Sequence, residues 1–176
     1  VSNGIHAEIV SVNKNLCAKI PDVVSDDQAC FTVLSAIGLH GIRLAKPTIG
    51  EFFVVYGLGL IGLLTSQILL AHGCQVLAID IDKNKVKLAN DLGVKAIISG
   101  NIDELLSITK SYCPGGADGV IITATNKSNE IIKNSAQICR KRGRIIMIGS
   151  TGMNMSRDDF YEKELKFQVS CSYGPG

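Results

Sequence analysis

The sequence contains no tryptophan, and four tyrosines and five phenylalanines make up only 5% of its 176 residues. So few aromatic side chains argue against a protein that stacks nucleic-acid bases. Charged residues are also sparse, at 19%, and a net charge of +2 provides no strong field for a nucleic acid or an acidic lipid surface. We therefore expect neither a nucleic acid nor a membrane as a partner. Hydrophobic residues, at 46%, suffice for a folded core.

The six cysteines include no C-x-x-C pair and no Cys/His pair at zinc-finger spacing, which argues against a structural zinc lobe. Most lie in apolar runs, where a thiol behaves as a small buried hydrophobe. No secretory signal peptide is recognisable, so a reducing cytoplasm is the expected location. The chain starts at Val1 and runs directly into structured-looking sequence, which we interpret as a segment of a longer protein.

No Asp, Glu, Lys or Arg occurs between Glu51 and Asp80, a stretch long enough to span a membrane. Its internal pattern favours a different structure. Residues 52–56 form a short apolar run typical of a strand buried on both faces, and a second such run covers residues 75–79. Between them, apolar residues recur at helical spacing from Leu60 until Gly73, which is placed as a helix C-cap. The stretch is therefore predicted to be a strand, a glycine turn, a helix and a second strand.

The turn has the pattern G-x-G-x-x-G at Gly57, Gly59 and Gly62, and Asp80 ends the following strand. Such a motif binds a dinucleotide when it leaves a strand, opens a helix and is followed by an acid. Gly57 would permit the tight turn, Gly59 the approach of a pyrophosphate, and Gly62 close packing of helix on strand. Asp80 would bind the ribose hydroxyls and repel a 2′-phosphate, which favours NAD over NADP. The alternative is a structural turn that binds nothing, with Asp80 as a solvated strand end.

Strands and helices continue to alternate along the chain, with strands expected at 95–99, 118–123 and 144–149 and helices at 82–92, 101–111 and 127–140. This order predicts an α/β fold with a doubly wound parallel sheet, in which ligands bind beyond the carboxyl ends of the first and fourth strands. The residues expected there are Thr123, Ala124, Thr125, Ile148, Gly149 and Ser150. Upstream, a capping box at residues 25–28 predicts one long helix to Ala45. The basic cluster Arg140, Lys141, Arg142 and Arg144 is expected to complete a helix C-terminus in solvent.

The order of several segments resembles the medium-chain dehydrogenase/reductase superfamily of alcohol and polyol dehydrogenases. These segments are His6–Val10, Lys19–Asp22, a helix, Pro47–Glu51, a strand and Gly57–Gly62. The resemblance covers nearly the whole chain. Residues 164–169 are similar to the sixth sheet strand of that family, expected at about 164–171. Residues 170–176 are similar to a bacterial two-domain oxidoreductase subgroup often associated with surface-polysaccharide pathways.

The resemblance implies a six-stranded Rossmann domain at residues 23–176, with residues 1–22 as a remnant of a catalytic barrel domain. Gly57, Gly59, Leu60, Ile61 and Gly62 match the pyrophosphate loop, Asp80 with the adjacent Ile81 matches the ribose acid, and Lys85 matches a basic residue that flanks the adenosine. The resemblance also implies a homodimer through the sixth strand, whose edge would otherwise expose unpaired backbone groups.

The sequence departs from zinc-dependent members of this family at Thr32 and Val33, where they place a metal ligand. Neither residue is a plausible zinc ligand there, which puts a catalytic zinc in doubt even for the intact enzyme. Cys30 lies nearby but is expected to be a buried thiol on the apolar face. His40 matches a histidine of polyol dehydrogenases and is expected to make a packing or polar contact. No metal ligand is therefore assigned.

Together these observations predict the NAD(H)-binding domain of an oxidoreductase that transfers hydride between nicotinamide and an alcohol or sugar carbon. The fragment is expected to bind cofactor without turning over substrate. This sequence identifies neither the substrate nor the catalytic residues. The alternative is a regulatory nucleotide-sensing domain of a potassium transport system, which has a similar glycine motif. Such domains begin almost at their first strand, and the 50 residues before Glu51 have no place in them.

Overall fold

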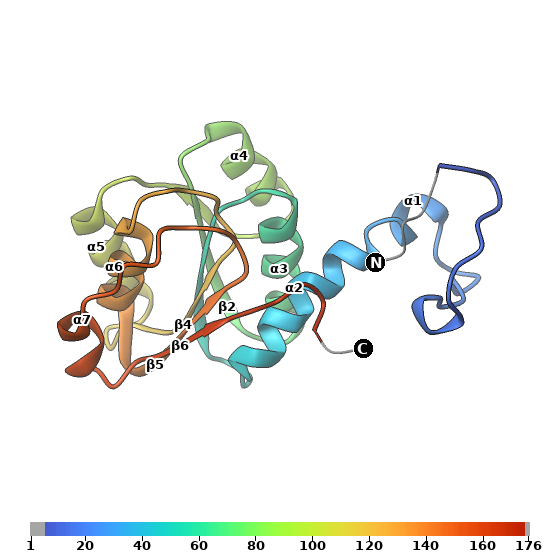
Figure 1. Ribbon diagram of the computed structural model, residues 1–176. Helices are drawn as coiled ribbons and strands as arrows, with labels where there is room; N and C mark the ends of the chain where they lie inside the picture. Colours follow the sequence, from blue (N-terminus) through green and yellow to red (C-terminus); the bar gives the residue numbers. More distant parts are fainter. Residues whose placement is uncertain (1–5, 175–176) are drawn as a thin grey trace. The chain divides into compact units, whose positions relative to one another are not determined.

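The computed structural model describes residues 6–174 (Figure 1), so Val1, Pro175 and Gly176 of the segments discussed above lie outside the described residues. The chain divides into two compact units, Val1–Thr32 and Val33–Gly176. In the first unit, the described residues form η1 (Lys14–Leu16) and α1 (Asp26–Ala29), neither of which contains a buried residue. The assignment of residues 1–22 to a catalytic domain stays a prediction.

The second unit contains a parallel sheet of six strands in the order β3-β2-β1-β4-β5-β6. The strands are β1 (Phe52–Tyr56), β2 (Gln75–Asp80), β3 (Ala96–Ile98), β4 (Ala117–Ile122), β5 (Cys139–Met147) and β6 (Lys166–Val169). Strands β1 and β4 are neighbours at the centre, where the direction of winding reverses. The predicted doubly wound Rossmann fold is therefore confirmed, and β6 is shorter than expected.

Helices cover both faces of the sheet (Figure 1). They are α2 (Thr32–Ala45), α3 (Leu60–Ala71), α4 (Lys83–Asp91), α5 (Ile102–Tyr112), α6 (Glu130–Ile138) and α7 (Arg157–Tyr161). Alternate β1 residues point to opposite faces: Phe53 and Val55 pack with α2, α3 and α4, whereas Val54 packs with α5 and α6. Because both faces are covered, β1 is buried at every position.

The uncharged stretch between Glu51 and Asp80 forms β1, α3 and β2, as its change of period predicts. Within residues 6–174, no helix is long and apolar enough to cross a membrane. The stretch lacks charge because its two strands lie in the interior of the sheet and α3 lies against it.

The single helix predicted from Ser25 to Ala45 is wrong, because α1 ends at Ala29 and α2 begins at Thr32. The expected capping box is present: the Ser25 hydroxyl accepts the Gln28 N–H, and the Gln28 side chain accepts the Ser25 N–H. The apolar pattern runs through both segments. Only α2 buries residues, however, so tertiary packing selects the second segment as the long helix.

The basic cluster at residues 140–144 is not the C-terminus of a helix, because α6 ends at Ile138 and β5 begins at Cys139. Residues 140–143 form an irregularity between the pairs Ala117–Cys139 and Gly119–Arg144. The cation at the end of α6 is instead Lys163, whose Nζ donates to three carbonyl oxygens, of Ala136, Gln137 and Cys139, at 2.7–2.9 Å. Its partial burial lowers the pKa of the Lys163 ammonium.

Two arginines of the basic cluster form ion pairs at the amino ends of the central strands. Arg140 Nε lies 2.6 Å from Asp118 Oδ1, and Arg144 lies 2.6 Å from Glu51. The other oxygen of Asp118 accepts the Phe52 N–H at 2.8 Å. We name Glu51, Asp118, Arg140 and Arg144 the amino-end ion cluster. These side chains pair with one another and with the strand backbone. The arginines at the amino ends of the strands are therefore accounted for by pairing within the protein, and no bound ligand is needed to explain them.

Candidate functional site

A cavity of about 550 Å³ lies beyond the carboxyl ends of β1, β2, β3 and β4, where sequence reasoning places a ligand. Eight of the predicted site residues line it: Gly57, Gly59, Asp80, Ile81, Lys85, Thr123, Ala124 and Thr125. A second hollow of about 560 Å³ lies beside α7, lined in part by Lys141, Arg157 and Tyr161. None of its lining residues directly follows β1 or β4, the two strands between which the winding of the sheet reverses. The cavity over β1 and β4 is therefore the candidate site.

The three glycines of the turn serve different purposes. Gly57 has φ +92°, a left-handed conformation that glycine adopts without strain. A Cβ on Gly62 would overlap the Gly57 carbonyl oxygen, so the absence of a side chain lets α3 pack directly on the end of β1. Gly59 lines the cavity, and a Cβ added to it would meet no atom within 4 Å. Its exposed backbone leaves room for a ligand to approach.

Helix α3 begins immediately after Gly59, which caps it without a side-chain hydrogen bond. The first N–H groups of a helix have no partner within the helix and carry a partial positive charge. No acidic residue lies in the first turn to neutralise it. The backbone at Leu60 and Ile61 therefore offers donors suited to an anion such as a pyrophosphate.

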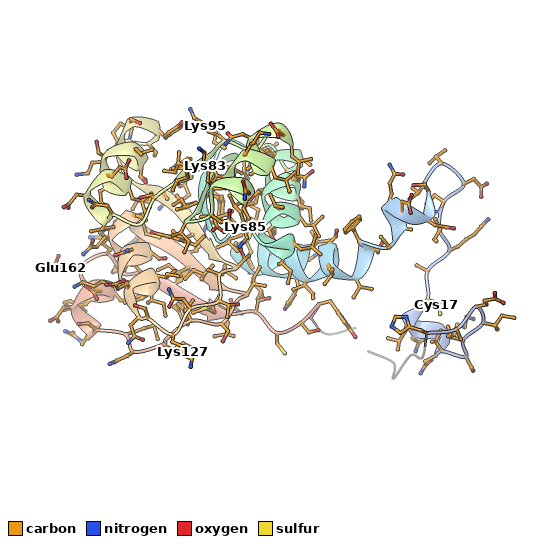
Figure 2. All side chains as sticks on the ribbon, turned by 90° about the horizontal axis from the view of Figure 1, so that it is seen from above. Cys17, Lys83, Lys85, Lys95, Lys127 and Glu162 are labelled. Atoms are coloured by element: carbon orange, nitrogen blue, oxygen red, sulfur yellow. The ribbon has the colours of Figure 1, made fainter. Side chains whose placement is uncertain are left out.

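Asp80 ends β2 at the cavity wall, and its side chain is only 8% exposed. Its Oδ2 accepts the Leu58 N–H at 2.7 Å, and its Oδ1 accepts the Asp82 N–H at 2.9 Å. The alternative of a solvated strand end is therefore wrong. Each carboxylate oxygen retains a further lone pair, so the group can accept additional hydrogen bonds from a ligand. Lys85 of α4, on the same helix as Lys83, lies 3.9 Å from Oδ2 and is half exposed (Figure 2).

Six predicted residues do not line the cavity: Leu60, Ile61, Gly62, Ile148, Gly149 and Ser150. Ile148 and Gly149 follow β5, and both donate their N–H to the Ile122 carbonyl at 2.8–2.9 Å. A Cβ on Gly149 would overlap the Ala124 carbonyl oxygen. These two residues thus join the ends of β4 and β5, and a role in binding stays a prediction.

Sequence reasoning missed several polar residues of the cavity. Ser99, Gly100 and Asn101 follow β3, while Asn126, Glu130 and Asn134 belong to the loop after β4 and to α6. The strand-end rule applies equally to β3 and could have found Ser99. Glu130 and Asn134 are four residues apart on α6 and share one helix face, but nothing in the sequence shows that this face meets the cavity.

Within residues 6–174, no group of three or more His, Cys, Asp or Glu residues lies close enough together to hold a metal ion. Cys30 is exposed, and its thiol lies 3.0 Å from the Asp27 carbonyl oxygen. The expectation of a buried Cys30 is therefore wrong, because Cys30 is the C-cap of α1, a short helix that buries none of its residues. Cys17 and Cys171 are exposed as well, whereas Cys74 and Cys139 are buried, and burial raises the pKa of Cys139 to about 12.

A parallel sheet with a glycine turn after its first strand and a held carboxylate after its second defines a Rossmann domain of the dinucleotide-binding type. Residues 61–176 match the model of the zinc-binding dehydrogenase family, and the chain belongs to that family. This confirms the resemblance to the medium-chain dehydrogenases. The family name implies zinc, but the described residues gather no ligand set that fits it.

Individual relatives agree with this assignment. The chain is 28% identical over 149 residues to an alcohol dehydrogenase from Moraxella sp. (strain TAE123), which covers 84% of this chain and 43% of the relative. A short chain alcohol dehydrogenase from E. coli CFT073, complexed with NADH, superposes with a TM-score of 0.79 at 23% identity, over 92% of this chain and 48% of that one. A protein described as a zinc-binding dehydrogenase from Sinorhizobium meliloti 1021, bound to NADP, superposes with a TM-score of 0.72 at 25% identity. The superposition covers 86% of this chain and 46% of that one. The chain spans less than half the length of the curated relatives it matches.

Proposed function

We propose that this chain is the NAD(H)-binding domain of an oxidoreductase that transfers hydride between nicotinamide and an alcohol or sugar carbon. The observation that carries the proposal is the Asp80 carboxylate, which lines the cavity and is oriented by the N–H groups of Leu58 and Asp82. A carboxylate fixed in this way is suited to accept hydrogen bonds from two neighbouring ribose hydroxyls. When bound, the nicotinamide supplies the hydride chemistry, while the protein binds and orients it.

Other groups in and next to the cavity support the same ligand. The N-terminus of α3 can bind the pyrophosphate, with Gly59 leaving room for its approach. Ile81, beside Asp80, is 81% exposed and offers an apolar surface on which an adenine ring could lie. Membership of the zinc-binding dehydrogenase family favours an oxidoreductase over the potassium-transport alternative.

The choice of NAD over NADP rests on the charge of the cavity next to the ribose. Asp80 presents a negative charge there, and a 2′-phosphate would be repelled by it. Lys85 lies 3.9 Å from that carboxylate and offsets part of the repulsion. Because relatives with NADH and with NADP are both known, the balance between these two side chains is the feature that we propose selects NAD.

We also propose a homodimer through β6. β6 is the last strand of the sheet and pairs with β5 along one edge. Within the described residues of the second unit, up to residue 174, no strand pairs with its other edge. An exposed edge favours pairing with a second copy across a two-fold axis. Sedimentation equilibrium should give a mass that rises to twice that of the chain with concentration, and a concentration-independent monomer would contradict the dimer.

Titration of NADH into the 176-residue chain, followed by fluorescence, tests the cofactor assignment. The chain should bind NADH more tightly than NADPH. Asp80→Asn should weaken NADH binding by about 10- to 100-fold, because a charge-assisted hydrogen bond contributes about 1.5–3 kcal/mol. Asp91→Asn, at the exposed end of α4, is the matched control and should leave both affinities unchanged. A folded chain that binds neither dinucleotide at millimolar concentration would refute the proposal.

A further inference from the structure

Thr123, immediately after β4, makes a hydrogen bond that its predicted role in ligand binding does not explain. Its hydroxyl oxygen lies 2.7 Å from the Gly57 carbonyl oxygen and 2.9 Å from that of Tyr56. A hydroxyl donates only one hydrogen. The Tyr56 carbonyl already accepts the Thr123 backbone N–H at 2.8 Å, so the hydroxyl hydrogen is best placed on Gly57, at the shorter distance.

The same peptide unit is held at its other end by Asp80. The Gly57 carbonyl and the Leu58 N–H belong to one planar peptide, and Leu58 donates to Asp80 Oδ2 at 2.7 Å. The hydroxyl of Thr123, this peptide and the carboxylate of Asp80 therefore form a continuous line. It runs from the end of β4, over the end of β1, to the end of β2, across the point where the sheet reverses its winding.

The Thr123 hydroxyl holds the carbonyl end of this peptide, and the Leu58–Asp80 hydrogen bond holds its N–H end. Gly57 has φ +92°, and a glycine tolerates a wide range of backbone conformations, including a reversed peptide after it. A reversed peptide would turn its carbonyl oxygen toward the Asp80 carboxylate and its N–H away. Gly62 packs on the same carbonyl oxygen, where even a Cβ would overlap it, so that side has no room for a substitute donor.

We propose that Thr123 is a positioning residue that fixes the orientation of Asp80 through the Gly57–Leu58 peptide and thereby contributes to the preference for NADH over NADPH. The cofactor part of this inference rests on the proposed function. The structural part, a Thr123 hydroxyl that controls the Leu58–Asp80 hydrogen bond, is independent of any ligand.

The structural part is tested on the protein without cofactor by the amide proton of Leu58 in ¹H–¹⁵N NMR spectra. Thr123→Val, which replaces the hydroxyl by a methyl group, should move this resonance in the same direction as Asp80→Asn does, whereas Thr123→Ser should leave it near its original position. If Thr123→Val does not fold, Thr123→Ala removes the hydroxyl without adding bulk. A Leu58 resonance unchanged in the folded valine or alanine variant would overturn the inference.

The cofactor part is tested by titration of the same variants with NADH and NADPH. Thr123→Val should raise the dissociation constant for NADH about tenfold and that for NADPH less than about threefold, and Thr123→Ser should restore the preference. Ser135→Ala is the matched control, because it removes a buried hydroxyl that donates to Ile131 within α6. It should lower stability without changing the preference.

Equal weakening of both dinucleotides by Thr123→Val would mean that the hydroxyl does not act on the preference for NADH through Asp80, and would overturn the cofactor part of the inference. A folded wild-type chain that binds neither dinucleotide would refute the proposed function, and the cofactor part with it. The Leu58 resonance would still report whether Thr123 controls Asp80, so the two failures are distinguishable.

Discussion

The two ends of the central strands carry similar groups but use them differently. At the amino ends, Glu51 and Asp118 pair with Arg140 and Arg144 and with the strand backbone. At the carboxyl ends, Asp80 is held by two N–H groups and has one half-exposed lysine beside it, in a cavity of about 550 Å³. The carboxylates at the amino ends pair with arginine guanidinium groups, which balance their charge within the fold. Asp80 is oriented by two neutral N–H groups at the wall of a cavity, where it can accept further hydrogen bonds from a ligand.

The largest expected effect is on stability, and it differs between two glycines of the same turn. Gly62→Ala should lower the free energy of unfolding by about 3 kcal/mol or more and abolish NADH binding, because its Cβ would overlap the Gly57 carbonyl oxygen. Gly59→Ala should change stability by less than about 0.5 kcal/mol, since its Cβ meets nothing within 4 Å, yet weaken NADH binding. Urea unfolding and fluorescence titration measure both. Equal stability losses in the two variants would contradict these roles.

At the amino ends, Asp118→Ala should cost about 1–3 kcal/mol, because it removes the carboxylate 2.6 Å from the partly exposed Arg140 guanidinium and leaves the Phe52 N–H without its acceptor. The dissociation constant for NADH should not change. Urea unfolding and titration of the same sample test this. A loss of NADH affinity without a loss of stability would mean that the amino-end ion cluster belongs to the binding site.

Lys163 supplies a smaller contribution at the end of α6. Lys163→Met keeps most of the apolar chain but removes three hydrogen bonds to carbonyl oxygens, and should cost about 1–2 kcal/mol. Lys127→Met, a substitution of an exposed lysine before α6, is the control and should have little effect. Thermal unfolding of both variants distinguishes a specific cap from a general effect of charge.

The smallest expected effect is a pH dependence from Cys139. Burial raises the pKa of this thiol from 9.0 to about 12, so the unfolded chain loses the proton first. Stability from this group is fully present below pH 9 and is lost as the pH rises toward 12. Between about pH 9 and 10 the loss should be about 1 kcal/mol. Cys139→Ala should flatten this part of the stability curve; an unchanged slope would show that other groups, such as Tyr56, whose pKa burial also raises, produce it.

Local signals in the sequence account for most of the sheet. The change of period around Gly57–Gly62 identifies β1, α3 and β2, and the helix expected at residues 101–111 is α5, with Asn101 as its N-cap. The residues that sequence reasoning misplaces depend on distant partners. The pattern assigns the basic cluster to a helix because neither Asp118, the partner of Arg140, nor Lys163, the true cap of α6, is adjacent in sequence.

The same reasoning explains what the sequence reveals of the site. Gly57, Gly59 and Asp80 are predictable because their roles follow from spacing within one βαβ unit. Glu130 and Asn134 are missed because their position depends on how α6 packs across the sheet. The bond from Thr123 to Gly57 joins residues 66 positions apart, and no pattern within either segment predicts it.

The most direct test of the central claim is a map of amide chemical shifts on addition of NADH. The amides of Gly59, Leu60 and Ile61 and those adjoining Asp80 should shift strongly, while those of Thr48, Phe52 and Asp118 at the opposite end should stay unchanged. Large shifts at the amino ends, or none at the carboxyl ends at saturating NADH, would contradict a division of the sheet into a binding end and a stabilising end.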